Sequence, residues 1–223
     1  MQPPVPFKLL DQNFWLSSDR VMYWEEEKTL IASDLHIGKT GHFRKSGIAM
    51  PQAVFKEDMQ RLVASLQFFK PAHLLIVGDL FHSVANKELN LFKKWREDLP
   101  HLQVTLVKGN HDILKEDWYA DAGIAVQADG LLSKGICFTH DNNCTTSQGW
   151  DTGQVQYTIS GHIHPGIAIK GVGRQSLSLP CFYFGETFAV LPAFSRFTGT
   201  ALIRPNAGDT VFAIVNQTVI KVR

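Results

Sequence analysis

Five short apolar segments of this chain each end in residues that commonly bind metal ions. TLIAS precedes Asp34 and His36, HLLIVG precedes Asp79, QVTLVKG precedes Asn110 and His111, GICFT precedes His140, and QYTISG precedes His162 and His164. Strands that end side by side in a sheet bring the residues that follow them into one polar cleft. The pattern therefore predicts a metal-binding cleft built from strand ends and points to a two-metal hydrolase.

The composition is that of an ordinary globular protein. The chain has 223 residues, of which 44% are hydrophobic and 19% charged, with a net charge of +1. This length is enough to bury a large core, and we expect one domain that spans residues 1–223. The balanced charge gives no support for an extended nucleic-acid or membrane surface. No apolar run has the length of a signal peptide or approaches the roughly 18 residues of a membrane span.

The three cysteines, Cys137, Cys144 and Cys181, are odd in number and show no CxxC spacing. Cys137 also lies inside an apolar, strand-like run. From this we expect neither paired disulfides nor a thiolate zinc site. The expected compartment is therefore the cytoplasm.

The first half of the chain alternates strand-like and helix-like segments. Residues 51–70 are predicted to form a helix, because apolar residues recur at helical spacing between Pro51 and Pro71. Residues 86–99 are predicted to form a second helix, with Leu89, Phe92 and Trp95 on one face.

After Gly153 the sequence changes to short runs rich in β-branched and aromatic residues, such as LSLPCFYFG, TFAVLPAF, TALIRP and TVFAIV. These runs predict antiparallel strands and hairpins. The expected fold class is α/β, a two-sheet β-sandwich flanked by helices, with the metal-binding residues in loops at one end of the sandwich.

The chemistry of the side chains supports a catalytic metal site. In an extended segment residues two apart point the same way, so Asp34 and His36 can face one site, as can His162 and His164. Carboxylate, imidazole and amide ligands without sulfur suit manganese, iron or zinc in a hydrolytic site better than structural zinc. The alternative is that these residues simply mark turns after strands. Five motifs in order, which hold five of the nine histidines, favour the metal site.

The ordered motifs Asp34-x-His36, Gly78-Asp79, Gly109-Asn110-His111-Asp112, His140 and Gly161-His162-Ile163-His164 resemble the signature of the calcineurin-like metallophosphoesterase superfamily. This resemblance implies a four-layer αββα fold with two divalent metal ions, manganese first, with iron or zinc as alternatives. It implies the following ligands: Asp34, His36 and His164 for one metal, Asn110, His140 and His162 for the other, and Asp79 between them.

The resemblance also implies a mechanism. A hydroxide activated by the two metals attacks the phosphorus atom, and His111 donates a proton to the leaving group. Asp112 is a candidate to orient His111. The sequence after Asp79 lacks the DRG of the phosphoprotein phosphatases, which argues against that branch. His82 is either a phosphate contact or a surface group.

Residues 41–51 and 191–199, together with GDLFHS, resemble the bacterial branch of ligase-associated DNA damage response endonucleases, called PdeM. Members of that branch are encoded with a DNA ligase, a helicase and an exonuclease-like protein, which are the implied partners. The implied activity is manganese-dependent cleavage of phosphodiesters, including DNA, in DNA repair.

Substrate contacts are expected next to the metal ligands. Arg44 can clamp a phosphate in bidentate fashion or be an ordinary surface arginine, and Asn110 and His82 are further candidates. Phe43 and Phe194 can stack on bases, although core packing is the favoured interpretation. The 22 lysines and arginines nearly balance the 21 acidic residues and are scattered, which fits a short single strand better than a duplex.

Three functions remain open at this point. The leading one is a phosphodiesterase or DNA endonuclease, and the second is a phosphomonoesterase or nucleotide phosphatase that uses the same site. The third is a non-catalytic repair scaffold. The complete ligand set and His111 count against the scaffold.

Overall fold

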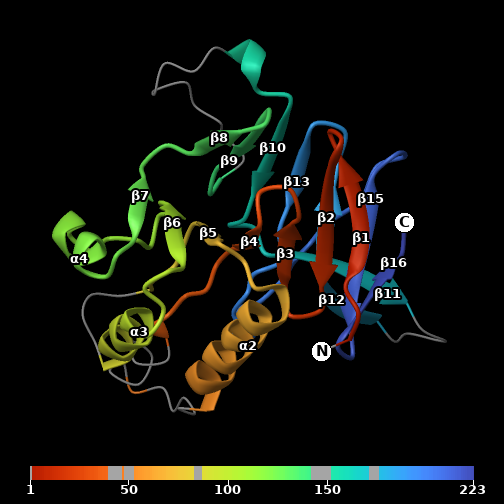
Figure 1. Ribbon diagram of the computed structural model, residues 1–223. Helices are drawn as coiled ribbons and strands as arrows, with labels where there is room; N and C mark the ends of the chain where they lie inside the picture. Colours follow the sequence, from red (N-terminus) through yellow and green to blue (C-terminus); the bar gives the residue numbers. More distant parts are fainter. Residues whose placement is uncertain (1, 40–46, 48–52, 83–86, 142–151, 171–175) are drawn as a thin grey trace.

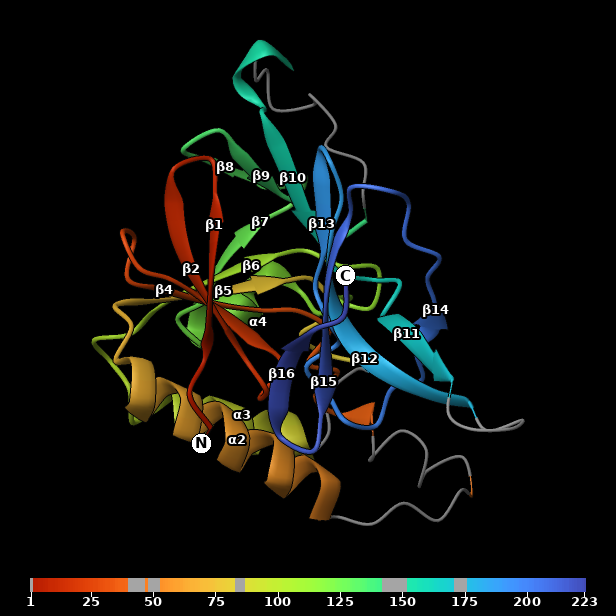
Figure 2. The same ribbon diagram turned by 90° about the vertical axis from the view of Figure 1, so that its right-hand side faces the viewer.

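Two mixed β-sheets pack face to face and form the centre of the molecule, as Figure 1 shows. The computed structural model describes residues 2–39, 47, 53–82, 87–141, 152–170 and 176–223. Turned by 90°, Figure 2 shows helices α2 and α3 running below the first sheet. The predicted two-sheet sandwich flanked by helices is confirmed.

The first sheet contains seven strands in chain order within the described residues. They are β1 (Val5–Leu9), β2 (Gln12–Ser17), β3 (Val21–Trp24), β4 (Thr29–Ala32), β5 (His73–Val77), β6 (Gln103–Val107) and β7 (Ala125–Gln127). Strands β1 to β4 form an antiparallel meander, whereas β4 to β7 are parallel. The parallel half therefore presents the ends of three successive strands, β4, β5 and β6, at one edge.

The second sheet is built from the C-terminal half of the chain. Its strands are β8 (Leu131–Ser133), β9 (Ile136–Phe138), β10 (Tyr157–Ser160), β11 (Pro165–Lys170), β12 (Ser176–Phe184), β13 (Phe188–Val190), β14 (Ala201–Leu202), β15 (Thr210–Val215) and β16 (Thr218–Lys221). Strand β12 pairs antiparallel with β11, β13 and β15, as predicted. Strand β14, from the TALIRP run, is instead parallel to β11, and β10 is parallel to both β9 and β13.

The helices are α2 (Ala53–Phe69), α3 (Lys87–Glu97) and α4 (Glu116–Asp121), with a short 3-10 turn η2 (Thr152–Gln154). Helices α2 and α3 confirm the two predicted helices, whose first residues, 51–52 and 86, lie outside the described part of the chain. Helix α4 was not predicted, since its six residues are too few to show a periodic pattern. None of the described helices has the length and apolar character needed to cross a membrane.

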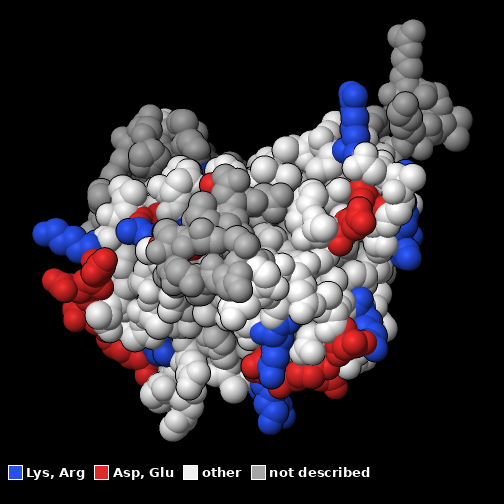
Figure 3. All heavy atoms as spheres, turned by 90° about the horizontal axis from the view of Figure 1, so that it is seen from above, with Lys and Arg blue, Asp and Glu red and all other residues white. Residues whose placement is uncertain are grey.

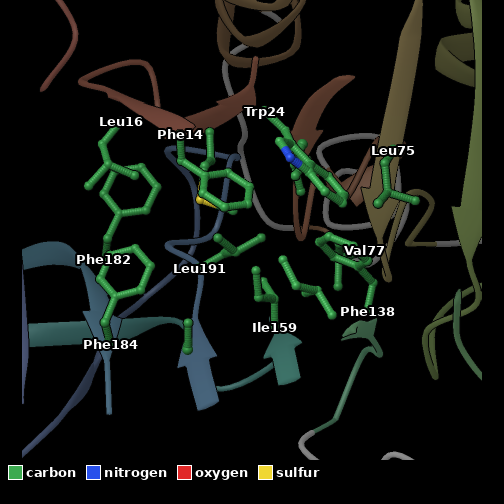
Figure 4. Close-up of a cluster of buried hydrophobic side chains, with 14 of the residues drawn as sticks. Phe14, Leu16, Trp24, Leu75, Val77, Phe138, Ile159, Phe182, Phe184 and Leu191 are labelled. Atoms are coloured by element: carbon green, nitrogen blue, oxygen red, sulfur yellow. The ribbon is translucent and has the colours of Figure 1, made fainter. Parts of the chain in front are cut away.

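The core between the sheets follows from the alternation of side chains along each strand. Ile31 on β4 and Leu75 and Val77 on β5 face the second sheet, whereas Leu74 and Ile76 face the helices. Both faces of these parallel strands are thus buried, which explains their continuous apolar sequence. Figure 4 shows the opposing side chains of this core, including Phe14, Trp24 and Leu75 on one side and Phe138, Ile159 and Phe182 on the other.

A second apolar cluster joins the first sheet to helices α2, α3 and α4 through Leu62, Phe92 and Tyr119. The outer face of the second sheet carries a smaller cluster around Cys181, Tyr183 and Val211. The described helices all pack on the first sheet. In these residues the sandwich therefore has three layers, helix, sheet and sheet, and the fourth layer implied by the family resemblance is not among them.

The cysteines differ from the expectation. Cys137, in the centre of β9, is disulfide-bonded, and Cys181 on β12 is a buried free thiol. The expectation of no disulfide is therefore wrong for Cys137. An odd number of cysteines excludes only complete pairing.

We predict that the inter-sheet core supplies much of the stability. Phe182 is fully buried between the sheets, and Phe68 on α2 is 51% exposed. Phe182→Ala should lower the free energy of unfolding by about 3–5 kcal/mol, and Phe68→Ala by about 0.5 kcal/mol or less. Urea unfolding of the two variants measures the difference, and equal losses would contradict this view of the core.

Candidate metal centre

The five predicted strand ends come from both sheets. Strands β4, β5 and β6 are parallel neighbours in the first sheet, and β9 and β10 are parallel neighbours in the second. The segments after them continue to pair: Asp34 N donates to Gly78 O (3.1 Å) and Gly161 N to His140 O (3.1 Å). The predicted polar cleft is therefore formed where the ends of two sheets meet.

The first group of side chains consists of Asp34, His36 and His164 (group 1), whose ligand-type atoms lie within 4.8 Å of one another. The Nε2 atoms of His36 and His164 are 3.4 Å apart, and His164 Nε2 is 3.3 Å from Asp34 Oδ1. Asp34 and His36 are buried, and His164 is half-buried. This group therefore lies at the deep side of the cleft.

The second group consists of Asp79, His140 and His162 (group 2), which satisfy the same distance limit. His140 Nε2 lies 3.4 Å from Asp79 Oδ1 and 3.1 Å from His162 Nδ1. Asn110 joins this group, because its Oδ1 is 2.9 Å from His140 Nε2. His162 and Asn110 are exposed, so group 2 opens to solvent.

Asp79 stands between the two groups. Its Oδ1 faces His140 at 3.4 Å, and its Oδ2 faces His36 Nε2 at 4.0 Å. The two oxygens of one carboxylate thus point toward different groups. This is the arrangement that a bridging carboxylate requires.

The donor set fits divalent cations. Asp34 Oδ1 is buried and has no hydrogen-bond donor among the described residues, an unfavourable state unless a cation or another positive charge compensates it. In each group the ring nitrogens and carboxylate oxygens lie within 4.8 Å of one another. Their lone pairs therefore converge on one point, where few hydrogen-bond donors are present. Imidazole and carboxylate groups in this number suit catalytic divalent metals.

The protonation states agree with cation binding. Burial lowers the pKa of His36 to about 3, so its imidazole is neutral at pH 7. Burial alone would raise the pKa of Asp79, but the hydrogen bond and charge of His140 and the amide of His111 lower it to about 2. Neutral imidazole and ionised carboxylate are the forms that bind metals. On the other ring nitrogen, His140 Nδ1 faces Val77 O at 3.5 Å, which leaves Nε2 toward the centre.

The backbone at the centre is left-handed and not extended as expected. The residues with φ near +50 to +70° include Asp34 (55°), His36 (50°), Asp79 (49°), His162 (67°) and His164 (50°). Each costs about 1–2 kcal/mol relative to the right-handed region, and such strain gathers at functional sites. The prediction that His162 and His164 face one site is wrong in detail, because this turn sends them to the two adjacent groups.

Three glycines allow the close packing of these turns. A Cβ on Gly78 would collide with the ring of His140, one on Gly109 with Asp79, and one on Gly161 with Ser33 and Asp34. Each glycine directly precedes a predicted ligand and lies under a residue from a different strand end. The repeated Gly before Asp79, Asn110 and His162 therefore reflects steric contact between the loops.

His111 lies beside the two groups. Its backbone N–H donates to Asp79 Oδ1 (2.9 Å), and its ring packs on those of His82 (4.5 Å between centroids) and His36 (5.6 Å). His82 is half-buried next to His111 and is not a remote surface group. Both imidazoles therefore lie beside His36 of group 1.

Asp112 has a different place from the predicted one. Its carboxylate accepts hydrogen bonds from the backbone amides of Gly109 (2.9 Å), Phe81 (3.0 Å) and Leu80 (3.4 Å). Burial raises its pKa to about 6, although these amides oppose the rise. Asp112 therefore joins the loops after β5 and β6, and the role of orienting the His111 ring is not supported by these contacts.

Two predicted substrate residues, Arg44 and Phe43, fall outside the described part of the chain. Phe194 is 1% exposed and packs in the core, which confirms the favoured interpretation. Lys39 was missed in the sequence. Burial lowers its pKa, and the nearby charges of Asp34 and Asp79 oppose part of this decrease. Its position five residues after Asp34 was the available signal.

Ser33 was also missed. Its hydroxyl is within hydrogen-bond reach of Asp34 Oδ2 and of Val77 O (2.9 Å). It fixes the orientation of the Asp34 carboxylate, and no residue-type pattern distinguishes such a serine from an ordinary strand end.

Known proteins share this fold. The calcineurin-like phosphoesterase family model matches residues 27–127. The solved structure of the Pseudomonas putida nuclease MPE is similar, with a TM-score of 0.81 and 26% identity, covering 98% of this chain and 100% of that chain. YfcE, a phosphoesterase from E. coli, is 16% identical with a TM-score of 0.41 over 87% and 97% of the two chains, a likeness too low to carry an argument. No curated protein matches the sequence significantly.

The fold and the two groups of ligand-type side chains define a metal-dependent hydrolase. In sequence, residues 27–127 are similar to the calcineurin-like phosphoesterase family, and in structure nearly the whole chain is similar to the nuclease MPE.

The glycine contacts generate a prediction. Gly109→Ala should displace the Asp79 carboxylate, because the new methyl group would overlap Oδ1 and the backbone nitrogen of Asp79. Gly199→Ala is the matched control, since nothing lies within 4 Å of its Cβ position. Manganese binding to metal-stripped protein should weaken by about 10- to 100-fold in the first variant and stay unchanged in the second. Unaltered binding in Gly109→Ala would show that Asp79 does not hold metal.

Proposed function

We propose that this protein is a phosphodiesterase that cleaves DNA with two divalent metal ions, manganese most favourably. The observation that carries the proposal is the pair of adjacent groups with Asp79 between them, on a fold shared over nearly its whole length with a nuclease. A carboxylate shared by two groups of ligands is the arrangement expected of a two-metal phosphoesterase.

The proposed ligands are those of the two groups. Asp34, His36 and His164 would hold one cation, His140, His162 and Asn110 the other, and Asp79 both. Two such cations, when bound, supply Lewis acidity and an activated water nucleophile at neutral pH.

His111 is the proposed proton donor to the leaving alkoxide. The backbone N–H of His111 donates to Asp79 Oδ1, and this bond holds the residue next to the centre. The imidazole ring itself is not one of the proposed metal ligands. The neighbouring His82 ring, 4.5 Å away, supports it from one side. A positioned imidazole of this kind contributes catalysis by general acid transfer.

Four residues are proposed to contact the substrate phosphate. Asn110 is exposed at the open side of group 2, and His82 lies next to His111. Lys39 lines the same small pocket as His36. Arg44 remains a proposal from the sequence alone, since it lies outside the described residues.

The surface charge favours a short substrate. On the face shown in Figure 3, described lysine and arginine side chains alternate with aspartate and glutamate around the rim. A protein that binds duplex through many phosphates needs a concentrated basic surface. We therefore propose single-stranded DNA or a small phosphodiester as substrate. Action in DNA repair in the cytoplasm, with a ligase, helicase or exonuclease as partners, rests on the sequence resemblance.

A substrate panel tests the reaction class. Metal-stripped protein refilled with manganese should cleave a phosphodiester and single-stranded DNA, and Asp79→Asn should remove both activities because it weakens both groups. Product release measured for a diester, a monoester and single-stranded DNA separates the candidates. Preference for the monoester would support the phosphatase, and no turnover despite bound manganese would support the scaffold.

A second experiment tests His111. His111→Ala should lower kcat for DNA by about 10²- to 10⁴-fold, with a much smaller loss for bis(p-nitrophenyl) phosphate, whose leaving group departs without a proton. His101→Ala, an exposed histidine before β6, is the control and should retain both activities. Equal losses on the two substrates, with metal content unchanged, would rule out the acid role.

A further inference from the structure

Two arginines bind three consecutive backbone carbonyls in the segment 193–195, which we call the strap. Arg20 Nη1 donates to Ala193 O (3.1 Å) and to Ser195 O (2.9 Å). Arg61, on α2, donates through Nη2 to the carbonyl between them, that of Phe194. Its guanidinium also lies over the Phe194 ring, 4.1 Å from the centroid. Every carbonyl of the strap is therefore held by a cation.

The strap is in turn bonded to the segment that carries Asp34. Phe194 N donates to Ser33 O (2.7 Å) and Ser195 N to Asp34 O (3.2 Å), and Ser33 pairs with Ala193 in a parallel β-bridge. The backbone N–H of Asp34 is held from the other side by Gly78 O (3.1 Å). Both backbone polar groups of Asp34 are thus fixed while its φ is 55°. A strained residue of this kind persists only where its surroundings hold it.

The two arginines remain charged in this position. Burial lowers the pKa values of Arg20 and Arg61 to about 10, still well above neutral pH. Asp58 pairs with Arg61 at 2.7 Å and offsets part of the charge. Hydrogen bonds from a cation to backbone carbonyls are stronger than neutral ones. The strap is accordingly held by charge-assisted bonds rather than by apolar packing alone.

We propose that Arg20 and Arg61 are positioning residues for group 1, which act through the strap on the backbone of Asp34. The proposal rests on the assignment of group 1 as a metal site. The proposal gives residues 191–199 a role. Arg61 stacks on the Phe194 ring, and the backbone N–H of Ser195 donates to Asp34 O. Group 2 has no bond to the strap among the described contacts, so its own metal binding should depend less on the two arginines.

The chain offers a matched control in Arg96. This buried arginine on α3 also donates to three backbone carbonyls, those of Leu99, Leu102 and Gly123. These contacts join α3 to the segments before β6 and β7, remote in sequence from the strap. Loss of Arg96 therefore removes the same kind of bonds without touching Asp34.

The test compares Arg61→Met with Arg96→Met. Manganese is titrated into the metal-stripped proteins and its binding is monitored by electron paramagnetic resonance, and thermal unfolding of both variants is measured. Both variants should unfold at lower temperature. Arg61→Met should bind one of its two manganese ions about 10- to 100-fold more weakly, and the spectrum of the remaining ion should match that of Asp34→Asn. Arg96→Met should bind both ions as the unaltered protein does.

Wild-type binding of both manganese ions by Arg61→Met would overturn the proposal, as would equal weakening in Arg96→Met. If Arg61→Met does not fold, Arg20→Gln takes its place. This substitution removes two of the three hydrogen bonds to the strap carbonyls, and Arg20 is only half-buried. Failure of the proposed function is distinguishable: unaltered protein that binds two manganese ions but cleaves no diester would refute the activity and leave this result standing.

Discussion

The structure depends on one carboxylate placed between two sheets. Asp79 follows β5 in the first sheet, yet one of its oxygens faces His140, which follows β9 in the second, and the other faces His36. It also accepts the His111 amide and lies over Gly109. Four of the five strand ends thus meet at this side chain. A shift of one sheet against the other would separate its two groups, which makes the inter-sheet core part of the site.

The backbone around Asp79 is strained, and the surrounding loops supply the compensation. Five residues of the two groups are left-handed. The amides of Asp34 and His36 donate to the carbonyls of Gly78 and Asp79 on the neighbouring strand end. Asp112 bonds three amides of the loops after β5 and β6, and the strap bonds Ser33 and Asp34. Rigid loops of this kind hold ligands in place before a cation binds, which is what a precise metal site requires.

The sequence predicted what depends on residue type and period. Helices α2 and α3 showed helical spacing, and the five strand ends were marked by apolar runs followed by Asp, Asn and His. The left-handed turns were missed, because Asp34 and His162 are not glycines and their φ is set by loop-to-loop bonds. The role of Asp112 was misjudged and that of Arg61 was missed for a related reason. Both bond to backbone groups, which are the same in every residue and leave no pattern of residue types in the sequence. The antiparallel strands β1 and β2 were not predicted, and Pro3, Pro4 and Pro6 lie in and just before β1.

The most direct test of the central claim is anomalous X-ray diffraction from crystals grown with manganese. The account predicts two manganese peaks per chain, one beside Asp34, His36 and His164 and the other beside His140, His162 and Asn110, about 3.5–4 Å apart with Asp79 contacting both. A single peak, or two peaks that Asp79 does not join, would contradict it.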